Sequence, residues 1–584
     1  NEVLVPVDGS PLIGAATPIA AYTTDLLGNT RSDTIPNIGA FEIAGDIVPP
    51  SITFVPLLNT SEVSNRTLAA TVFDYNGVNN TANPPRIYFR KKSNANTFID
   101  NTPASDGWKY TTGTGSGYSY NFTIDYNLIY GGVIPGDQIE YFIVAQDNSP
   151  NHLTGASSGI FPTPLTSTLL NINNFPVENV KHSYFISIPF AGIVEVGQGK
   201  PFTSLTNSDG LFAALNNGIL VGNLQVRITS NLSESGVVPL KKITCENNNP
   251  YTISIYPTGN YTISGSAPTS MITFDGTERL TIDGRINRTG STNALTIQNN
   301  QTSATVIRMM NSVKNITIRN CNIISASATS TCYGIVASAP SSLTTGSGGN
   351  DSISILYNNI YRAYYGIRIA GVSGEEILAP KVIGNNFGNN GTSGDGHYYA
   401  LYVSFSYDAV IDSNNIFNNT TSACYAIYNY RNYYGSVKYN TIRYQGTSSL
   451  YAIYNYYSDF SDVSYNRIEN CNSALIYAIY SYYPKNATYT GNIIRNNSST
   501  STTYYIYSYY TQSSTFSNNI VENNLSTSTQ YLAYLYYGSG TTLANNIFRN
   551  NNNTGTSTVY GIYVYYHPNA VITGNTISGK RAYC

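Results

Sequence analysis

From residue 300 onward, apolar and polar residues alternate in short stretches separated by Asn, Ser, Thr and Gly. β-branched and aromatic residues dominate the stretches and no helical period is visible, so the pattern predicts short strands joined by turns. An Asn followed by a β-branched or aromatic pair, as in Asn440-Thr441-Ile442, recurs throughout the region. Four consecutive intervals of 26 residues occur in the series Asn322, Asn358, Asn385, Asn414, Asn440, Asn466, Asn492, Asn518, Asn545 and Asn575.

A tyrosine motif keeps the same period, beginning with Tyr425-Ala426-Ile427-Tyr428-Asn429-Tyr430. Side chains alternate between the two faces of a strand, so Ile453 should point inward with Tyr451 and Asn455 on its side. Tyr454 and Tyr456 should then point outward beside the small Ala452. This predicts two outer columns that form a candidate contact face: Tyr428, Tyr454, Tyr480, Tyr507, Tyr534, Tyr563, and Tyr430, Tyr456, Tyr482, Tyr509, Tyr536, Tyr565.

A period of 26 residues with about three short strands fits one coil of a parallel β-helix. A propeller blade needs roughly 40–45 residues, and a leucine-rich repeat would show Leu at fixed offsets. Stacked coils bring equivalent residues together, so the recurring amides are expected to form a structural column, as amide ladders do in stacked strands. The predicted Asn column comprises Asn414, Asn440, Asn466, Asn492, Asn518, Asn545 and Asn575.

On these motifs, residues 300–584 resemble the pectin-lyase-like right-handed β-helix of large secreted, cell-surface proteins of the Bacteroidota type. Segments such as Leu280-Thr281-Ile282-Asp283-Gly284 make residues 178–299 similar to the leading coils and cap of such proteins. The resemblance implies an all-β fold with incomplete coils at the C-terminal end. It implies little about function, because the fold hosts lyases, hydrolases, tailspikes and adhesins.

Residues 47–177 read as a different module. Alternating runs such as Ile87-Tyr88-Phe89-Arg90 over roughly 120 residues predict an immunoglobulin-like or fibronectin-like β-sandwich, with the single Trp, Trp108, in its core.

Residues 1–46 resemble the closing segment of a β-helix, although they stand at the beginning. The chain also stops at Cys584, where another tyrosine strand is expected. Two interpretations stay open. The chain is one period of a tandem array, or residues 1–46 close the β-helix of a neighbouring subunit in a head-to-tail filament.

Composition narrows the choice of function. Charged residues make up 11% of the chain and the net charge is −2, which disfavours a nucleic-acid partner. No apolar run is long enough to span a membrane. The six cysteines show no zinc spacing, so no metal and no cofactor are expected, while one or two disulfides stay open.

The acidic residues decide whether an enzymatic function is plausible. Hydrolysis of a glycosidic bond needs two carboxylates that flank the bond. The best pair is Asp459 and Asp462, with Lys438 and Arg467 on neighbouring coils, and solvated turn carboxylates are the simpler interpretation. The polygalacturonase-like pattern also has a His-Gly motif, whereas His397 is followed by Tyr398.

We therefore expect no catalytic residues and a structural role. The predicted function is a segment of an extracellular, cell-surface fibre or adhesin, assembled head-to-tail or as a tandem array, with a Tyr-rich contact face. Expected partners are the protein itself and a polysaccharide or another cell surface. The alternative is a polysaccharide-active lyase or glycoside hydrolase.

Overall fold

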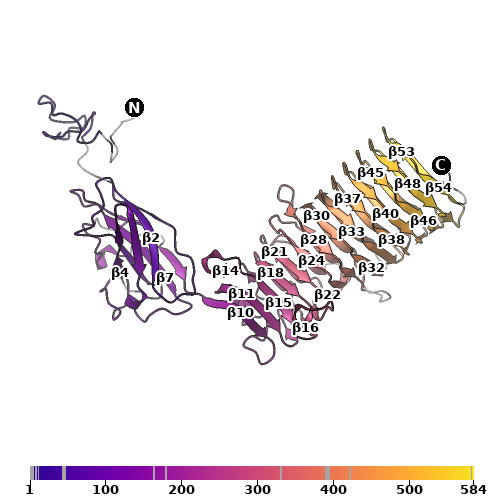
Figure 1. Ribbon diagram of the computed structural model, residues 1–584, viewed down its shortest axis with the longest axis horizontal. Coiled ribbons are helices and arrows are strands. Elements are labelled where there is room, and N and C mark those ends of the chain that lie inside the picture. The colour runs from indigo at the N-terminus through magenta and orange to yellow at the C-terminus, as the bar shows by residue number, and fades with distance from the viewer. Residues whose placement is uncertain are drawn as a thin grey trace. The chain divides into compact units, whose positions relative to one another are not determined.

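The fold was analysed in a computed structural model that describes residues 6, 10, 12–42, 48–95, 97–161, 165–175, 177, 181–328, 332–388, 395–419, 423–579 and 582–583. The chain divides into two compact units (Figure 1). The first unit comprises Asn1–Pro189 and Glu246–Asn249, and the second comprises Phe190–Cys245 and Pro250–Cys584. Cys584, where the sequence predicts a further strand, lies outside the described residues.

The first unit contains two antiparallel sheets, as the alternating runs predict. One sheet has the order β1-β2-β6-β5 and the other has the order β4-β3-β7-β8, with β9 also paired to β7. The strands are β1 (Ser51–Phe54), β2 (Arg66–Phe73), β3 (Arg86–Lys91), β4 (Lys109–Thr112), β5 (Thr114–Ser116), β6 (Ser119–Ile124), β7 (Gln138–Gln146), β8 (Thr154–Ala156) and β9 (His182–Phe185). Because β9 follows residue 177, this sheet continues past the boundary expected from the sequence.

The sheet built on β3 and β7 is buried on both of its faces. Phe89 on β3 belongs to a core cluster that includes Phe122 of the other sheet, while the preceding Tyr88 packs on the opposite side. There Trp108 lies edge-on to Phe142, with ring centroids 5.0 Å apart. The expectation that Trp108 is a core residue is confirmed, and its cluster is separate from the one between the sheets.

The second unit is a stack of coils with three parallel sheets, so the predicted β-helix is confirmed (Figure 1). The first sheet continues from β11 (Gly218–Ile228) to β53 (Val571–Thr573), and the second from β12 (Leu232–Ser233) to β54 (Thr576–Ser578). The third sheet continues from β13 (Leu240–Lys241) to β55 (Ala582–Tyr583).

One regular coil consists of β34 (Ser436–Lys438), β35 (Thr441–Gln445) and β36 (Ser449–Tyr456), one strand in each sheet. The next coil pairs with it residue for residue, with Val437 opposite Val463, Ile442 opposite Ile468 and Ile453 opposite Ile479. The register therefore advances by the 26 residues predicted from the sequence.

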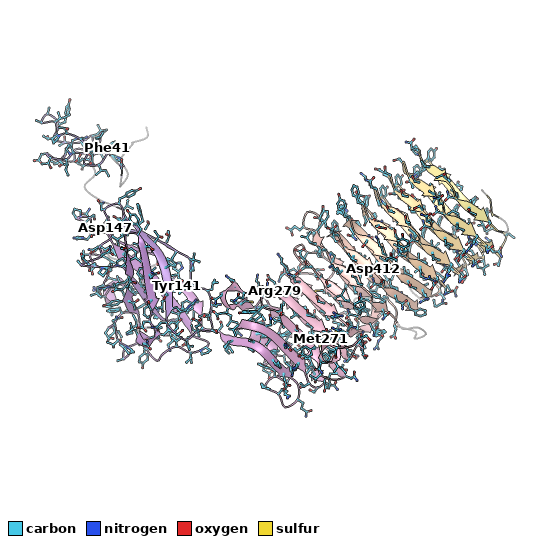
Figure 2. All side chains as sticks on the ribbon, in the orientation of Figure 1. Phe41, Tyr141, Asp147, Met271, Arg279 and Asp412 are labelled. Atoms are coloured by element: carbon cyan, nitrogen blue, oxygen red, sulfur yellow. The ribbon has the colours of Figure 1, made fainter. Side chains whose placement is uncertain are left out.

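The interior of the β-helix is one continuous apolar core. In the leading coils it includes the fully buried Met271, which Figure 2 labels. The short helix α1 (Leu211–Asn216) adds Leu211, Phe212 and Leu215 to this core. The apolar face of α1 thus packs against apolar residues of the first coils.

Candidate functional site: the tyrosine face

The third sheet presents the tyrosines. Its regular strands are β33 (Cys424–Tyr433), β36, β40 (Leu475–Tyr482), β44 (Thr503–Tyr509), β48 (Gln530–Tyr536) and β52 (Val559–Tyr565). These strands pair in register, so Tyr428 lies opposite Tyr454 and Tyr430 lies opposite Tyr456. Parallel strands lie about 4.8 Å apart, which is close to the separation of stacked aromatic rings.

Both predicted tyrosine columns form. In the first, ring centroids of successive residues are 4.8 Å apart for Tyr454–Tyr480 and 5.2 Å apart for Tyr507–Tyr534. In the second, Tyr482 and Tyr509 stack at 4.8 Å with an interplanar angle of 8°. All of these rings are half-buried except Tyr565, which is exposed.

The expected inward orientation of Tyr451 is wrong. Tyr451 is half-buried and stacks on the rings of Tyr425 and Tyr477, at 4.4 and 4.9 Å. Ala452, expected outside, is fully buried together with Ile453, so two consecutive residues face the core and the strict alternation breaks between them. Ile453 and Asn455 point inward as predicted, and Tyr454 and Tyr456 point outward.

Tyr451 belongs to a further column that the sequence reasoning missed, and a fourth column follows the strand ends. We number the columns across the third sheet and call them together the tyrosine face. Columns two and three are the predicted ones, and column two also contains Tyr402. Column one is Tyr333, Tyr365, Tyr399, Tyr425, Tyr451, Tyr477, Tyr504, Tyr531 and Tyr560, and column four is Tyr457, Tyr483, Tyr510, Tyr537 and Tyr566.

The tyrosine face is neutral over most of its width. Burial among neighbouring rings raises the pKa of Tyr428, Tyr454 and Tyr480 far above the usual phenol range, so their hydroxyls stay protonated. Cations lie at the edge, where the Arg368 guanidinium lies 5.1 Å from the centroid of Tyr402. The face can therefore offer ring surfaces and hydroxyl hydrogen bonds, but little charge.

The predicted Asn column is an amide ladder inside the coils. Asn440 donates its backbone N–H and its Nδ2 to Oδ1 of Asn466, each at 3.0 Å. Asn466 donates in the same way to Asn492, and its Nδ2 also reaches the carbonyl oxygen of Val437 at 2.8 Å. Each side-chain amide thus bonds to backbone groups of the preceding coil and to the amide of the following coil, which satisfies these buried polar groups.

The prediction that Asn518 and Asn545 belong to this column is wrong. The ladder continues from Asn492 to Asn519 and then to Asn546 and Asn575. Asn518 and Asn545 precede the ladder positions and adopt the left-handed conformation, with φ of 55° and 56°. The coil lengthens here from 26 to 27 residues. Because Asn518-Asn519 and Asn545-Asn546 are pairs of Asn, the spacing did not reveal which member lies in the ladder.

A second amide ladder was not recognised from the sequence. Asn497 donates to Oδ1 of Asn524, and Asn524 donates to Oδ1 of Asn551, each at 2.9 Å. The pairs Asn496-Asn497, Asn523-Asn524 and Asn550-Asn551 recur at intervals of 27 residues and were the available signal.

The acidic residues considered for catalysis have separate partners. Asp462 forms an ion pair with Lys438 at 2.6 Å, and Asp459 accepts the backbone N–H of Lys485 at 2.8 Å. Arg467 instead joins Arg443 and Arg495 around the buried carboxylate of Glu469, at 2.7–2.9 Å.

His397 is enclosed in the coils. Its Nδ1 lies 2.8 Å from the carbonyl oxygen of Ala363 and its Nε2 lies 3.2 Å from that of Ile360. Burial lowers the pKa of His397 to about 4.

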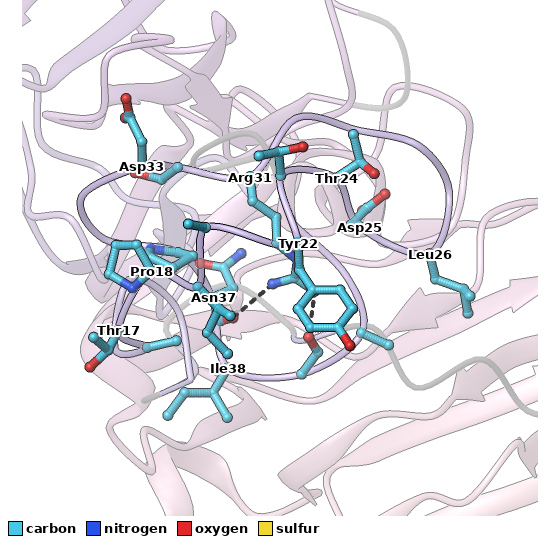
Figure 3. Close-up of a pocket in the computed structure, with 18 residues that line it drawn as sticks. Thr17, Pro18, Tyr22, Thr24, Asp25, Leu26, Arg31, Asp33, Asn37 and Ile38 are labelled. Atoms are coloured by element: carbon cyan, nitrogen blue, oxygen red, sulfur yellow. Dashed lines mark hydrogen bonds between the residues drawn. The ribbon is translucent and has the colours of Figure 1, made fainter.

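Residues 12–42 form a second candidate contact surface, shown in Figure 3. The Asp25 carboxylate accepts backbone N–H groups of Leu27, Asn29 and Glu42 at 2.8–2.9 Å. Burial opposes ionisation of Asp25, but these hydrogen bonds prevail and lower its pKa to about 2. Leu26 and Leu27 are 74% and 72% exposed, and Leu26 lines a cavity of about 760 Å³. Polar groups therefore hold the segment together while several large apolar side chains are exposed, although Phe41 is buried (Figure 2).

The cysteines and the candidate metal ligands are dispersed in the described part of the chain. No three His, Cys, Asp or Glu side chains gather there closely enough to hold a metal ion. Cys245, Cys321, Cys332, Cys424 and Cys471 are buried free thiols. No helix among the described residues is both long and apolar enough to span a membrane.

Comparison with known proteins supports the β-helix. A family model described as the right handed beta helix region matches residues 477–584, which is less than half of the chain. The A-module of the mannuronan C-5 epimerase AlgE6 from Azotobacter vinelandii is a similar solved structure, at 12% identity over 65% of this chain and 97% of that chain. Its TM-score of 0.26 is too low to support any argument about function. No curated protein matches the sequence.

Proposed function

We propose that this chain is a structural segment of an extracellular, cell-surface fibre or adhesin. The β-helix supplies a stiff rod, because each coil is bonded to its neighbours along three sheets. The tyrosine face supplies the contacts. The observation that carries this proposal is the unbroken stacking of column one from Tyr333 to Tyr560, at 4.4–5.2 Å per step.

A broad aromatic surface with hydroxyls suits two kinds of partner. It can stack on the sugar rings of a polysaccharide, or it can pack against a second fibre. Nucleic acids bind to strongly positive surfaces, whereas this chain has only 11% charged residues and a net charge of −2.

Residues 12–42 supply the end-to-end contact in this proposal. Their exposed Leu26, Leu27 and Tyr22 are apolar side chains that gain free energy by leaving water. They close the β-helix of the preceding unit in a tandem array, or that of a neighbouring subunit. Such head-to-tail contacts generate open fibres.

Electron microscopy of variants tests the lateral contact. Replacing column three at Tyr456, Tyr482 and Tyr509 with Ser should abolish bundling or polysaccharide binding while single rods persist. The matched control replaces Tyr434, Tyr439 and Tyr465 with Ser, since these exposed tyrosines lie outside the tyrosine face. Equal loss in both variants, or no loss in the first, would overturn the proposed contact.

The end-to-end contact is tested separately. Leu26→Asp with Leu27→Asp should shorten filaments, because charges would be buried at the junction. The native material is then denatured and the mass of its chain is determined, which distinguishes a filament of subunits from a tandem array. A chain close to 63.5 kDa indicates subunits, and a much larger chain indicates a tandem array. Small discrete particles in both native and variant samples would contradict a fibre.

A further inference from the structure

The oxidisable side chains of this chain are unusually distributed. The sequence has 53 Tyr but one Trp, three Met and six Cys. Trp108, Met271 and Met309 are buried, and the five described cysteines are buried as well. Oxidants attack accessible thiolates and thioethers first, and these groups are buried here except Met310, which is half-buried in the leading coils. An oxidant that reaches the regular coils therefore meets phenol rings.

Most successive rings within columns three and four are stacked, but some pairs from neighbouring coils are in edge contact. The ring centroids of Tyr456 and Tyr482, one coil apart, are separated by 4.7 Å with an interplanar angle of 84°. Tyr537 and Tyr565, also from neighbouring coils, are 5.4 Å apart at 81°. In an edge-to-face pair, the edge of one ring faces the other ring, so the ring carbons of the two phenols lie close together.

We propose that columns three and four are a site of oxidative tyrosine coupling, which joins neighbouring coils by dityrosine bonds. The co-reactant is a one-electron oxidant from outside, such as a peroxidase with hydrogen peroxide. Each of two phenols gives one electron to the oxidant and its hydroxyl proton to solvent. The two phenoxyl radicals form one carbon–carbon bond between their ortho positions, and each ring hydrogen at that bond then moves to the oxygen. With peroxide, two phenols and one H₂O₂ yield one dityrosine and two waters.

The fold favours coupling within one chain over coupling between chains. Partner rings are already adjacent, so the second radical need not be found by diffusion. The register fixes which residues meet, such as Tyr456 opposite Tyr482 and Tyr509 opposite Tyr536. A covalent link between coils restricts the unfolded chain, as any cross-link does. The inference does not depend on the fibre proposal, because both rings belong to the same molecule.

The experiment oxidises the full chain with a photoactivated tris-bipyridyl ruthenium complex and persulfate, in native buffer and in guanidinium chloride. Dityrosine fluorescence gives the yield, and mass spectrometry of peptides maps the linked residues by the loss of two hydrogen atoms per link. In the native chain, links should join tyrosines of columns three and four in neighbouring coils. In the unfolded chain this pattern should disappear.

The sandwich unit contains the internal control. Tyr75 and Tyr130 are 64% and 48% exposed, more than most column rings, and among the described residues neither packs against another tyrosine. If accessibility alone decided the reaction, their intermolecular links would dominate, and that result would overturn the proposal. So would an absence of dityrosine, or the same map in native and unfolded chains.

A single variant tests the geometry at one pair. Tyr456→Phe keeps a stacking ring but cannot form a phenoxyl radical. It should lose the Tyr456–Tyr482 link and retain the Tyr537–Tyr565 link, since that pair is also in edge contact. Retention of a link to position 456, or loss of both, would contradict pairing by the geometry of the coils.

Discussion

Asn466 and Tyr456 each stand in a column of like residues, one inside the β-helix and one on the tyrosine face. Inside, Asn466 is fully buried and bonded to both neighbouring coils at 2.8–3.0 Å. On the tyrosine face, the centroids of successive rings lie 4.4–5.3 Å apart, and most of the rings are half-buried. The same repeat thus produces two kinds of column, with different consequences for stability.

The difference follows from what each side chain would lose if its neighbour disappeared. A buried amide without its partner keeps donors and acceptors that water cannot reach, which costs about 1–3 kcal/mol for each group. A tyrosine without its partner loses a ring contact of about 0.5–1.5 kcal/mol, and water replaces it. We therefore expect the ladder to determine stability and the tyrosine face to determine contacts.

The largest effect is expected for Asn466→Ala. The substitution removes the acceptor of two Asn440 donors and the donor to the Val437 carbonyl. The free energy of unfolding should fall by about 3–5 kcal/mol, measured by denaturant titration.

The control is Asn518→Gly, at an exposed position with φ of 55° that lies outside the ladder. It should change the free energy of unfolding by less than about 1 kcal/mol, since Gly accepts this conformation. Equal losses at positions 466 and 518 would contradict the one-residue shift of the ladder.

That shift marks the limit of what the sequence could predict. The β-helix, its period and the ladder from Asn414 to Asn492 follow from strict spacing. Asn518 and Asn545 were misassigned because the coil lengthens by one residue beside an Asn neighbour, and spacing alone cannot decide which Asn points inward. Only the hydrogen bonds of Asn519 and Asn546 do so.

The width of the tyrosine face was underestimated for a related reason. A period of two assigns Tyr451 to the inside, but Ala452 and Ile453 both face the core. A break in the alternation depends on how the coils close around the core, which a period of two does not encode. The contact columns at Tyr454 and Tyr456 were predictable because strict alternation resumes after Ile453.

The second prediction concerns a buried polar group without a ladder, His397. Its pKa is lowered to about 4 from 6.5, so the unfolded chain binds a proton at a higher pH than the folded chain. Stability should therefore fall as the pH decreases from about 6.5 to 4, by up to about 3 kcal/mol. His397→Gln should remove this slope, whereas a change at the exposed His152 should not. An unchanged pH profile in His397→Gln would show that other groups cause it.

The third prediction tests an ion cluster on the outside of the second sheet. Burial opposes ionisation of Glu469, but hydrogen bonds from Arg443, Arg467 and Arg495 outweigh it and lower the pKa of Glu469 below 4.5. This carboxylate therefore stabilises the fold above about pH 4.5, and the contribution is lost as the pH falls further. Glu469→Gln should cost about 1–2 kcal/mol at neutral pH, because the arginines are partly exposed.

The matched variant is Glu522→Gln, whose carboxylate meets the single Arg549 at 2.6 Å. Its cost should be smaller, and thermal unfolding of the two variants at pH 7 and pH 3 gives the comparison. If Glu522→Gln were the more damaging change, the number of arginines around a carboxylate would not determine its contribution.

The smallest effect is expected on the tyrosine face itself. Tyr482→Phe retains the ring that stacks on Tyr509 and loses only a hydroxyl at a half-buried position, so the free energy of unfolding should change by less than about 0.5 kcal/mol. Tyr482→Ser removes the ring and should cost about 1–2 kcal/mol, still less than Asn466→Ala. Denaturant titration of both variants measures these costs. A loss in Tyr482→Phe as large as that in Asn466→Ala would show that the hydroxyls hold the coils together, and the division between a stabilising interior column and an outer contact column would then be wrong.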